Sequence, residues 1–302
     1  MNTNIDFAGI KMKNPVTVAS GTFGYGRDHG QFMDLSKLGG IITKGTSLEP
    51  REGNKPPRIV ETSSGALNAI GLQNPGVEHF LETDLPFLRR YDVAVIANVI
   101  GKTMDEYVEM CKILNKENVD GIELNLSCPN VKQGCLAFGN TYEGVLEITK
   151  AVRKVLDKPL IVKLTPNVTD ITLTAKAVED AGADAVSLVN TFTAMVIDTH
   201  TRKPVLGNNT GGLSGPAIKP IAVRMVYQVA QAVKIPILGM GGIVCGNDAI
   251  EFMLAGASAV SIGLGNFIKP DLSLDVASEI EDYMKKYNVE NVSDIIGTVT
   301  MN

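Results

Sequence analysis

Polar side chains that could bind a ligand stand at or just after the ends of apolar runs of the sequence. In chain order they are Ser20, Lys44, Asn98, Asn125, Lys163 and Asn190. Any one of them alone has a structural explanation, because Asn ends strands through local turns and the stem of Lys lies along apolar surface. Lys163, for example, could form an ion pair with Glu123. Six such groups together are costly to bury unless something hydrogen-bonds to them, so they predict a ligand site.

Two glycine-rich segments indicate that this ligand carries a phosphate group. Gly239–Ile243 and Ser261–Gly265 lie at the ends of two further apolar runs. Glycine lets backbone N–H groups approach an anion closely, and a helix that begins there adds the positive end of its dipole. The alternative is that these glycines serve only as turns.

The segment Asn125–Asn130 contains a candidate catalytic base, Cys128. A thiol with a pKa near 8.5 can remove a proton once a positive neighbour or desolvation tunes it. Cys111 falls on the apolar face of a helical segment and is expected to pack in the core, and neither Cys135 nor Cys245 has an evident role. No Ser/His/Asp arrangement is visible, which disfavours a hydrolase.

Composition and charge exclude several classes of protein. The 302 residues are 44% hydrophobic and 20% charged, which suits a large core and argues against disorder. The net charge of −5 disfavours a nucleic-acid binder. No run is long and apolar enough to span a membrane, and the first ten residues lack the pattern of a signal peptide. Without C-x-x-C pairs or clustered histidines we expect no metal site. We also expect a cytoplasmic location, where the four cysteines remain thiols.

Short apolar runs alternate with amphipathic helical segments along the whole chain. The predicted strands are Val16–Ala19, Ile41–Lys44, Val93–Val99, Gly121–Leu126, Leu160–Leu164, Ala185–Asn190, Pro236–Met240 and Ala259–Ile262. Several are almost continuously apolar, which is typical of parallel strands covered on both faces. Thr103 and Glu106 predict a capping box at one intervening helix, and Thr141 and Asp170 predict the starts of two others.

Eight strands with intervening helices predict an α/β fold, a (β/α)₈ TIM barrel formed by residues 1–302 as a single domain. Segments 45–76 and 191–215 are rich in Gly, Pro, Asn and Thr, and we expect them to be long loops over the C-terminal mouth. The start, Ile5–Val18, predicts a small hairpin that plugs the opposite end. A doubly wound sheet is the alternative, but its G-x-G-x-x-G phosphate signature is missing.

Six motifs, in order along nearly the whole chain, resemble those of the dihydroorotate dehydrogenases. They are Thr43–Thr46, Glu49–Arg51, Asn68–Asn74, Asn125–Asn130, Val162–Asn167 and Gly211–Pro216. Cys128, where the membrane-bound class has Ser, is similar to the soluble class 1. The form of Asn68–Asn74 and the lack of an N-terminal membrane extension resemble class 1B, the catalytic subunit that works with NAD.

The resemblance implies a barrel that binds one FMN per chain and oxidises dihydroorotate to orotate in pyrimidine biosynthesis. It implies that Cys128 is the base. The implied FMN ligands are Ser20, Lys44, Gly45, Asn98, Asn125, Lys163, Val189, Gly215, Gly241, Gly242, Gly263 and Leu264. The implied substrate ligands are Lys44, Asn68, Ala69, Ile70, Gly71, Leu72, Asn125, Asn130, Asn190 and Thr191. Lys163 would face the flavin edge that gains negative charge on reduction, and Lys44 would balance the substrate carboxylate.

The resemblance also implies a partner. In class 1B a second subunit with FAD and a [2Fe–2S] cluster passes electrons to NAD⁺, and a homodimer of catalytic subunits forms the centre of a heterotetramer. This chain has neither the cysteine spacing of such a cluster nor a Rossmann fingerprint, so FAD and the cluster are expected only on the partner.

The sequence leaves other functions open. A class 1A-like enzyme would reduce fumarate, and an FMN-dependent dihydropyrimidine dehydrogenase would also use a Cys. A dihydrouridine synthase would act on RNA, which the net charge of −5 disfavours. Outside enzymes, a flavin-free phosphate-binding scaffold barrel would share the glycine segments. The colour of the purified protein separates this last possibility from the others.

Overall fold

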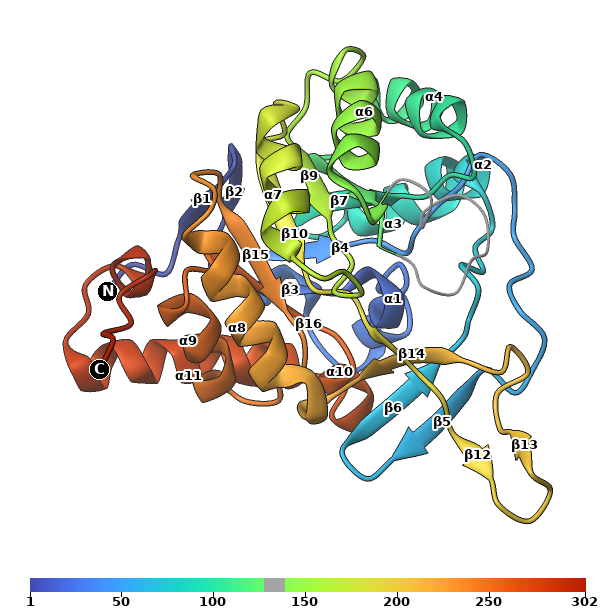
Figure 1. The fold of residues 1–302 in the computed structure, drawn as a ribbon. Coiled ribbons are helices and arrows are strands. Elements are labelled where there is room, and N and C mark those ends of the chain that lie inside the picture. The colour runs from blue at the N-terminus through green and yellow to red at the C-terminus, as the bar shows by residue number, and fades with distance from the viewer. Residues whose placement is uncertain (128–138) are drawn as a thin grey trace.

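Eight parallel strands close into a barrel in the computed structural model, which describes residues 1–127 and 139–302 (Figure 1). The strands are β3 (Val16–Val18), β4 (Gly40–Ile42), β7 (Ala94–Val99), β8 (Gly121–Asn125), β9 (Leu160–Lys163), β10 (Ala185–Leu188), β15 (Ile237–Met240) and β16 (Ala259–Ile262). Each neighbours the next in chain order, and β16 returns to pair with β3. All eight predicted strands and the barrel are thereby confirmed.

Helices cover the outside of the barrel between the strands (Figure 1). The longer ones are α4 (Met104–Asn115), α6 (Tyr142–Arg153), α7 (Ile171–Asp180), α8 (Lys219–Ala230), α9 (Gly246–Leu254) and α11 (Leu272–Tyr287). The short ones are α1 (Ser20–Phe23), α2 (Val77–His79), α3 (Leu85–Leu88) and α10 (Gly265–Ile268), with a π-turn η3 (Phe80–Asp84) and 3₁₀ turns η1 (His29–Gln31), η2 (Leu35–Lys37), η4 (Pro216–Ile218) and η5 (Val292–Ile295). Among the described residues, no helix has the length and apolar character needed to cross a membrane.

The predicted helix starts are confirmed, with one correction. The side chains of Thr141 and Asp170 accept hydrogen bonds from the first turns of α6 and α7. Thr103 likewise accepts from the Glu106 amide at 3.2 Å. The capping box is only half formed, however, because the Glu106 carboxylate accepts from the amide of Lys102 instead of that of Thr103.

An N-terminal hairpin plugs the end of the barrel opposite the strand C-termini. Strands β1 (Ile5–Phe7) and β2 (Ile10–Met12) pair antiparallel. Phe7, Ile10 and Met12 are buried against barrel residues that include Ile96 and Ile161. The hairpin is shorter than the predicted Ile5–Val18, because β2 ends at Met12 and the next run is already β3 of the barrel.

A second sheet lies beside the barrel, within the two segments that we predicted to be loops. It consists of β5 (Ile59–Thr62), β6 (Gly65–Asn68), β14 (Gly211–Ser214) and β11 (Phe192–Ala194), in the order β11-β14-β6-β5. A two-stranded ribbon, β12 (Ile197–Asp198) and β13 (Lys203–Pro204), extends from it (Figure 1). Because these strands are short and pair across distant parts of the chain, such as Gly212 with Asn68, local apolar patterns do not reveal them.

Candidate active site

A cavity of about 580 Å³ opens where the barrel strands end. It is large enough for a cofactor-sized ligand. Of the predicted ligands, those that line it are Ser20, Lys44, Gly45, Asn68, Ile70, Gly71, Leu72, Asn125, Lys163, Val189, Asn190, Thr191, Gly215, Gly241, Gly242, Gly263 and Leu264. Residues from all parts of the sequence thus meet at one site because the strands are parallel and end at the same face of the barrel.

Four predicted site residues are placed elsewhere or lie outside the described residues. Asn98 is fully buried below the cavity, on the strand next to Asn125. Ala69 is buried in the small core of the second sheet with Leu67. Cys128 and Asn130 lie outside the described residues.

The cavity also includes residues that the sequence did not single out. Asp28, His29 and Phe267 contribute to its lining from the turns that follow β3 and β16. His29 stacks on Phe23 with ring centroids 4.1 Å apart, and burial lowers the pKa of His29. The histidine was not singled out because it lies ten residues beyond the end of its predicted strand, in a short 3₁₀ turn.

Two lysines bring positive charge to the cavity. Lys163 is 5% exposed, and burial lowers the pKa of Lys44. Within residues 1–127 and 139–302, neither ammonium group forms a hydrogen bond or an ion pair. The structural alternative for Lys163, an ion pair with Glu123, is not formed, because Glu123 instead accepts hydrogen bonds from the side chains of Asn98 and Ser187. Both lysines are therefore available to an anionic or electron-rich ligand.

The amide side chains of Asn125 and Asn190 line the inner wall of the cavity. Asn125 is 5% exposed, and its Nδ2 donates to Oδ1 of Asn98 at 3.3 Å. The Oδ1 of Asn125 accepts from the hydroxyl of Ser127 at 2.8 Å. Nδ2 of Asn190 donates to the same hydroxyl at 2.9 Å. An amide offers both a donor and an acceptor, so this wall suits a heterocycle with N–H and C=O groups.

The glycine segments form a tight backbone cradle at the other side of the cavity. A Cβ atom on Gly242 would lie 2.7 Å from the carbonyl oxygen of Gly215, and Gly242 has φ +80°. Beyond the cradle, the carboxylate of Asp248 accepts from the amide of Val244 at 2.9 Å and from Lys219 at 2.6 Å. Although burial opposes it, these hydrogen bonds hold the pKa of Asp248 below its usual value. The cradle therefore has a fixed shape that only glycine permits.

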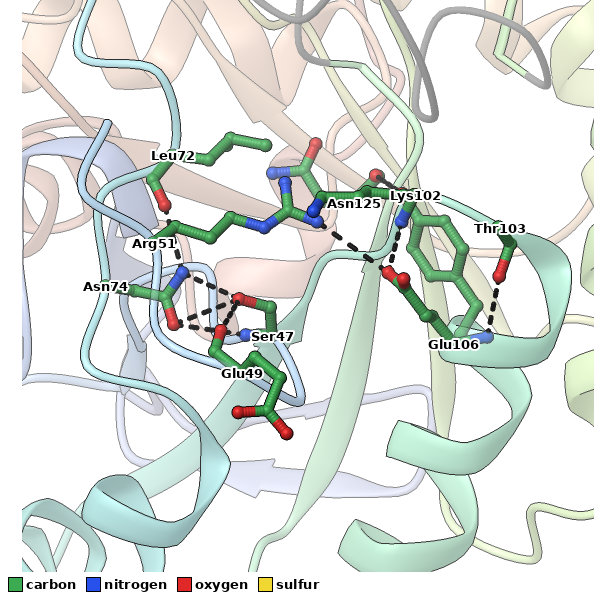
Figure 2. Close-up of polar contacts among 10 residues, drawn as sticks. Ser47, Glu49, Arg51, Leu72, Asn74, Lys102, Thr103, Glu106 and Asn125 are labelled. Carbon is green, nitrogen blue, oxygen red and sulfur yellow. Dashed lines mark hydrogen bonds and ion pairs between the residues drawn. The ribbon is translucent and has the colours of Figure 1, made fainter. Parts of the chain in front are cut away.

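Two loops at the mouth are tied together by side chains (Figure 2). Asn74 donates to the carbonyl of Leu72 and to the hydroxyl of Ser47, both at 2.9 Å, so it joins the Asn68–Leu72 segment to the loop after β4. Arg51, from that same loop, reaches the carboxylate of Glu106 on α4 at 3.8 Å. These contacts fix the outer rim against the barrel.

Cys111 and Cys245 are the two cysteines within residues 1–127 and 139–302. Burial raises the pKa of Cys111 to about 12, so it is an inert core thiol as predicted. No group of three or more His, Cys, Asp or Glu side chains within the described parts of the chain could hold a metal ion.

Comparisons with known proteins agree on one family. The family model for dihydroorotate dehydrogenase matches residues 2–284. The chain is 56% identical to the dihydroorotate dehydrogenase B (NAD(+)) catalytic subunit of Thermoanaerobacter pseudethanolicus over 299 residues, 99% of each chain. It is 54% identical to the protein of the same name from Alkaliphilus metalliredigens, again over 299 residues and 99% of each chain.

A solved structure shares the fold. The dihydroorotate dehydrogenase of Eimeria tenella, crystallised with ferulenol, superimposes with a TM-score of 0.82 at 22% identity, and the match covers 98% of this chain and 88% of that one. The extent of the family match and the identity to the bacterial relatives show that this chain belongs to the dihydroorotate dehydrogenase family.

Proposed function

We propose that this protein oxidises dihydroorotate to orotate as the catalytic subunit of an NAD⁺-dependent, class 1B dihydroorotate dehydrogenase. The observation that carries the proposal is the cavity at the strand C-termini, where two lysines without partners in the described chain meet the amide side chains of Asn68, Asn125 and Asn190. In a chain 56% identical to such subunits, the charge and the hydrogen-bonding capacity of these groups suit an anionic pyrimidine.

FMN is the cofactor we propose for this cavity. The glycine cradle supports this proposal. Its glycines have no side chains, so backbone N–H groups can approach the phosphate of FMN closely. The buried ammonium group of Lys163 also fits, since no neighbour in the described residues neutralises it. When bound, FMN supplies the hydride acceptor that protein side chains cannot provide. Ser20, Gly215, Gly241, Gly242, Gly263 and Leu264 would hold it from the barrel mouth.

The protein's own residues bind and orient the substrate. We propose that Lys44 balances the carboxylate of dihydroorotate, and that Asn68, Asn125 and Asn190 bind its ring amide groups. Cys128 is the proposed base that removes the proton from C5 of the ring.

A partner subunit completes the proposed enzyme. The relatives are named as catalytic subunits, which supports the existence of a second polypeptide. We propose that this partner carries FAD and a [2Fe–2S] cluster and passes the electrons to NAD⁺, in a heterotetramer built on a homodimer of this chain.

Substitution of Cys128 tests the assignment. We expect Cys128→Ala to lower the turnover of dihydroorotate by about 10²–10⁴-fold, the usual share of a general base, while FMN stays bound. Stopped-flow reduction of the yellow holoenzyme by dihydroorotate measures this directly, without a partner. Near-normal reduction by the variant, or reduction of the wild type by dihydrouracil in preference to dihydroorotate, would contradict the proposal.

A further inference from the structure

The cradle segment, residues 241–244, joins the end of β15 to the start of α9 and is held by very few hydrogen bonds. The flanking carbonyls of Met240 and Cys245 both accept backbone hydrogen bonds. Between them, counting partners in residues 1–127 and 139–302, the amide of Val244 is the one backbone group that forms a hydrogen bond. Its acceptor is the carboxylate of Asp248, at 2.9 Å.

Asp248 is buried in the first turn of α9, and its two carboxylate oxygens have different partners. Oδ2 accepts from the Val244 amide, whereas Oδ1 accepts from the ammonium group of Lys219 at 2.6 Å. Lys219 is the first residue of α8, and its ammonium group also donates to the carboxylate of Glu251 at 2.7 Å. Through these contacts, Asp248 connects the cradle segment to the starts of both helices.

The backbone of Lys219 forms the wall behind the cradle segment. A Cβ atom on Gly242 would lie 2.9 Å from Cβ of Lys219 and 3.0 Å from its backbone nitrogen. Gly241 and Gly242 line the cavity, and within the described chain their amides and that of Ile243 have no acceptor. Three successive N–H groups without acceptors suit an anion such as phosphate. Asp248 itself does not line the cavity, so its hydrogen bond acts on the segment rather than on a ligand.

We propose that Asp248 is a positioning residue for the phosphate group of FMN. By binding the Val244 amide, it fixes the three preceding amides in one arrangement and thereby strengthens the preference for FMN over riboflavin, which lacks the phosphate. The proposal rests on the function proposed above. Without an acceptor at position 248, the Val244 amide is left unsatisfied, and the glycines before it gain conformations in which their N–H groups no longer converge. FMN then has to order the segment when it binds, at a cost in affinity that riboflavin does not bear.

Three variants of the full-length chain, freed of flavin and titrated with FMN and with riboflavin, test the proposal. Asp248→Ala removes the acceptor of the Val244 amide. Asp248→Asn removes the same negative charge but keeps an oxygen for that amide. Asp170→Ala is the matched control, because Asp170 accepts from the Thr172 amide at 2.9 Å at the start of α7 and does not line the cavity.

We expect Asp248→Ala to weaken FMN binding by about tenfold, the usual effect of one hydrogen bond to a charged group, and riboflavin binding by less than about twofold. Asp248→Asn should keep FMN affinity within about threefold of wild type, and Asp170→Ala should leave both affinities within about twofold. Lower stability weakens the binding of both flavins by the same factor, so the ratio of the two affinities separates positioning from a general loss of stability.

Quenching of flavin fluorescence measures these affinities. An unchanged affinity ratio in Asp248→Ala would overturn the proposal, as would equal losses of FMN affinity in Asp248→Ala and Asp248→Asn. If riboflavin binds too weakly to measure, a larger loss of FMN affinity in Asp248→Ala than in Asp248→Asn supports the proposal, because the two variants carry the same charge. If Asp248→Ala does not fold, Asp248→Leu fills the space without an acceptor and takes its place, with the same two outcomes. Failure of the wild type to bind FMN would instead refute the proposed function.

Discussion

At the scale of single residues, Lys44 connects the charge of the site to pH. Its amine has no partner in the described chain, and burial lowers its pKa below the ordinary value of 10.5. A substrate carboxylate binds the protonated amine, so affinity should be constant at low pH and should fall as pH rises through this lowered pKa. Orotate dissociation constants measured from pH 6 to 10 should therefore show an alkaline loss that begins before pH 10.5.

Lys44→Arg is the control for this pH dependence. A guanidinium group stays charged throughout the range, so the alkaline loss should disappear even if the absolute affinity falls. An alkaline loss of the same shape in both proteins would show that another group titrates.

The polar residues at the site differ in how far the sequence could identify them. Asn125 and Lys163 stand at strand ends, and the barrel geometry alone places such residues at one mouth. The alternative reading of Lys163, an ion pair with Glu123, could not be tested from the sequence, because a carboxylate and a lysine on successive predicted strands are plausible partners there. Strand register decides which neighbour an inward-facing side chain contacts, and it places Asn98 opposite Glu123. A local sequence pattern does not predict this register.

At the scale of elements, the cradle between the ends of β15 and β16 can be tested with a matched pair of glycine substitutions. Gly242→Ala places a Cβ 2.7 Å from a carbonyl oxygen at φ +80°, so it should cost about 1–3 kcal/mol of stability and loosen FMN. Gly263→Ala meets nothing nearer than 3.8 Å, so stability should stay within about 0.5 kcal/mol. FMN affinity should still fall about tenfold or more, because the new methyl group lies at the cavity wall.

Thermal unfolding and fluorescence titration with FMN separate the two effects. If Gly263→Ala binds FMN as tightly as the wild type does, the prediction is wrong, and the phosphate of FMN does not lie at the end of β16.

The same scale shows where prediction from sequence stops. The barrel strands were found because each is buried on both faces and forms an apolar run of its own, as Leu160–Lys163 does. The second sheet was missed because β14 consists of two glycines followed by two half-buried residues, and it is a strand only through its pairing with β6 and β11. An apolar run therefore identifies a strand that is buried in the core. A partly exposed strand at the periphery forms only through pairing with its neighbours, which its own sequence does not show.

At the scale of the whole molecule, the hairpin plug and the cavity lie at opposite ends of the barrel and should be separable by mutation. Phe7 is fully buried against the lower barrel. Phe7→Ala should lower the free energy of unfolding by about 3–5 kcal/mol, because it leaves a void in this core. Orotate affinity at low temperature should not change.

Lys11→Ala, on the exposed side of the same hairpin, is the control. Its ion pair with Asp6 lies in solvent, so the change should be within about 0.5 kcal/mol. Denaturant unfolding of both variants measures the difference, and a loss of orotate affinity in Phe7→Ala would show that the two ends are coupled.

The pairing of β16 with β3 also governs how the protein can be made. On the ribosome, β3 is among the first segments to emerge, yet its partner at residues 260–262 is among the last. Until then every growing intermediate exposes an open sheet edge, which invites pairing with other nascent copies. Synthesis arrested before β16 should accordingly yield insoluble polypeptide rather than a smaller enzyme. The yield of soluble protein should depend more on rapid translation of the final quarter of the chain than on the translation rate of its first part.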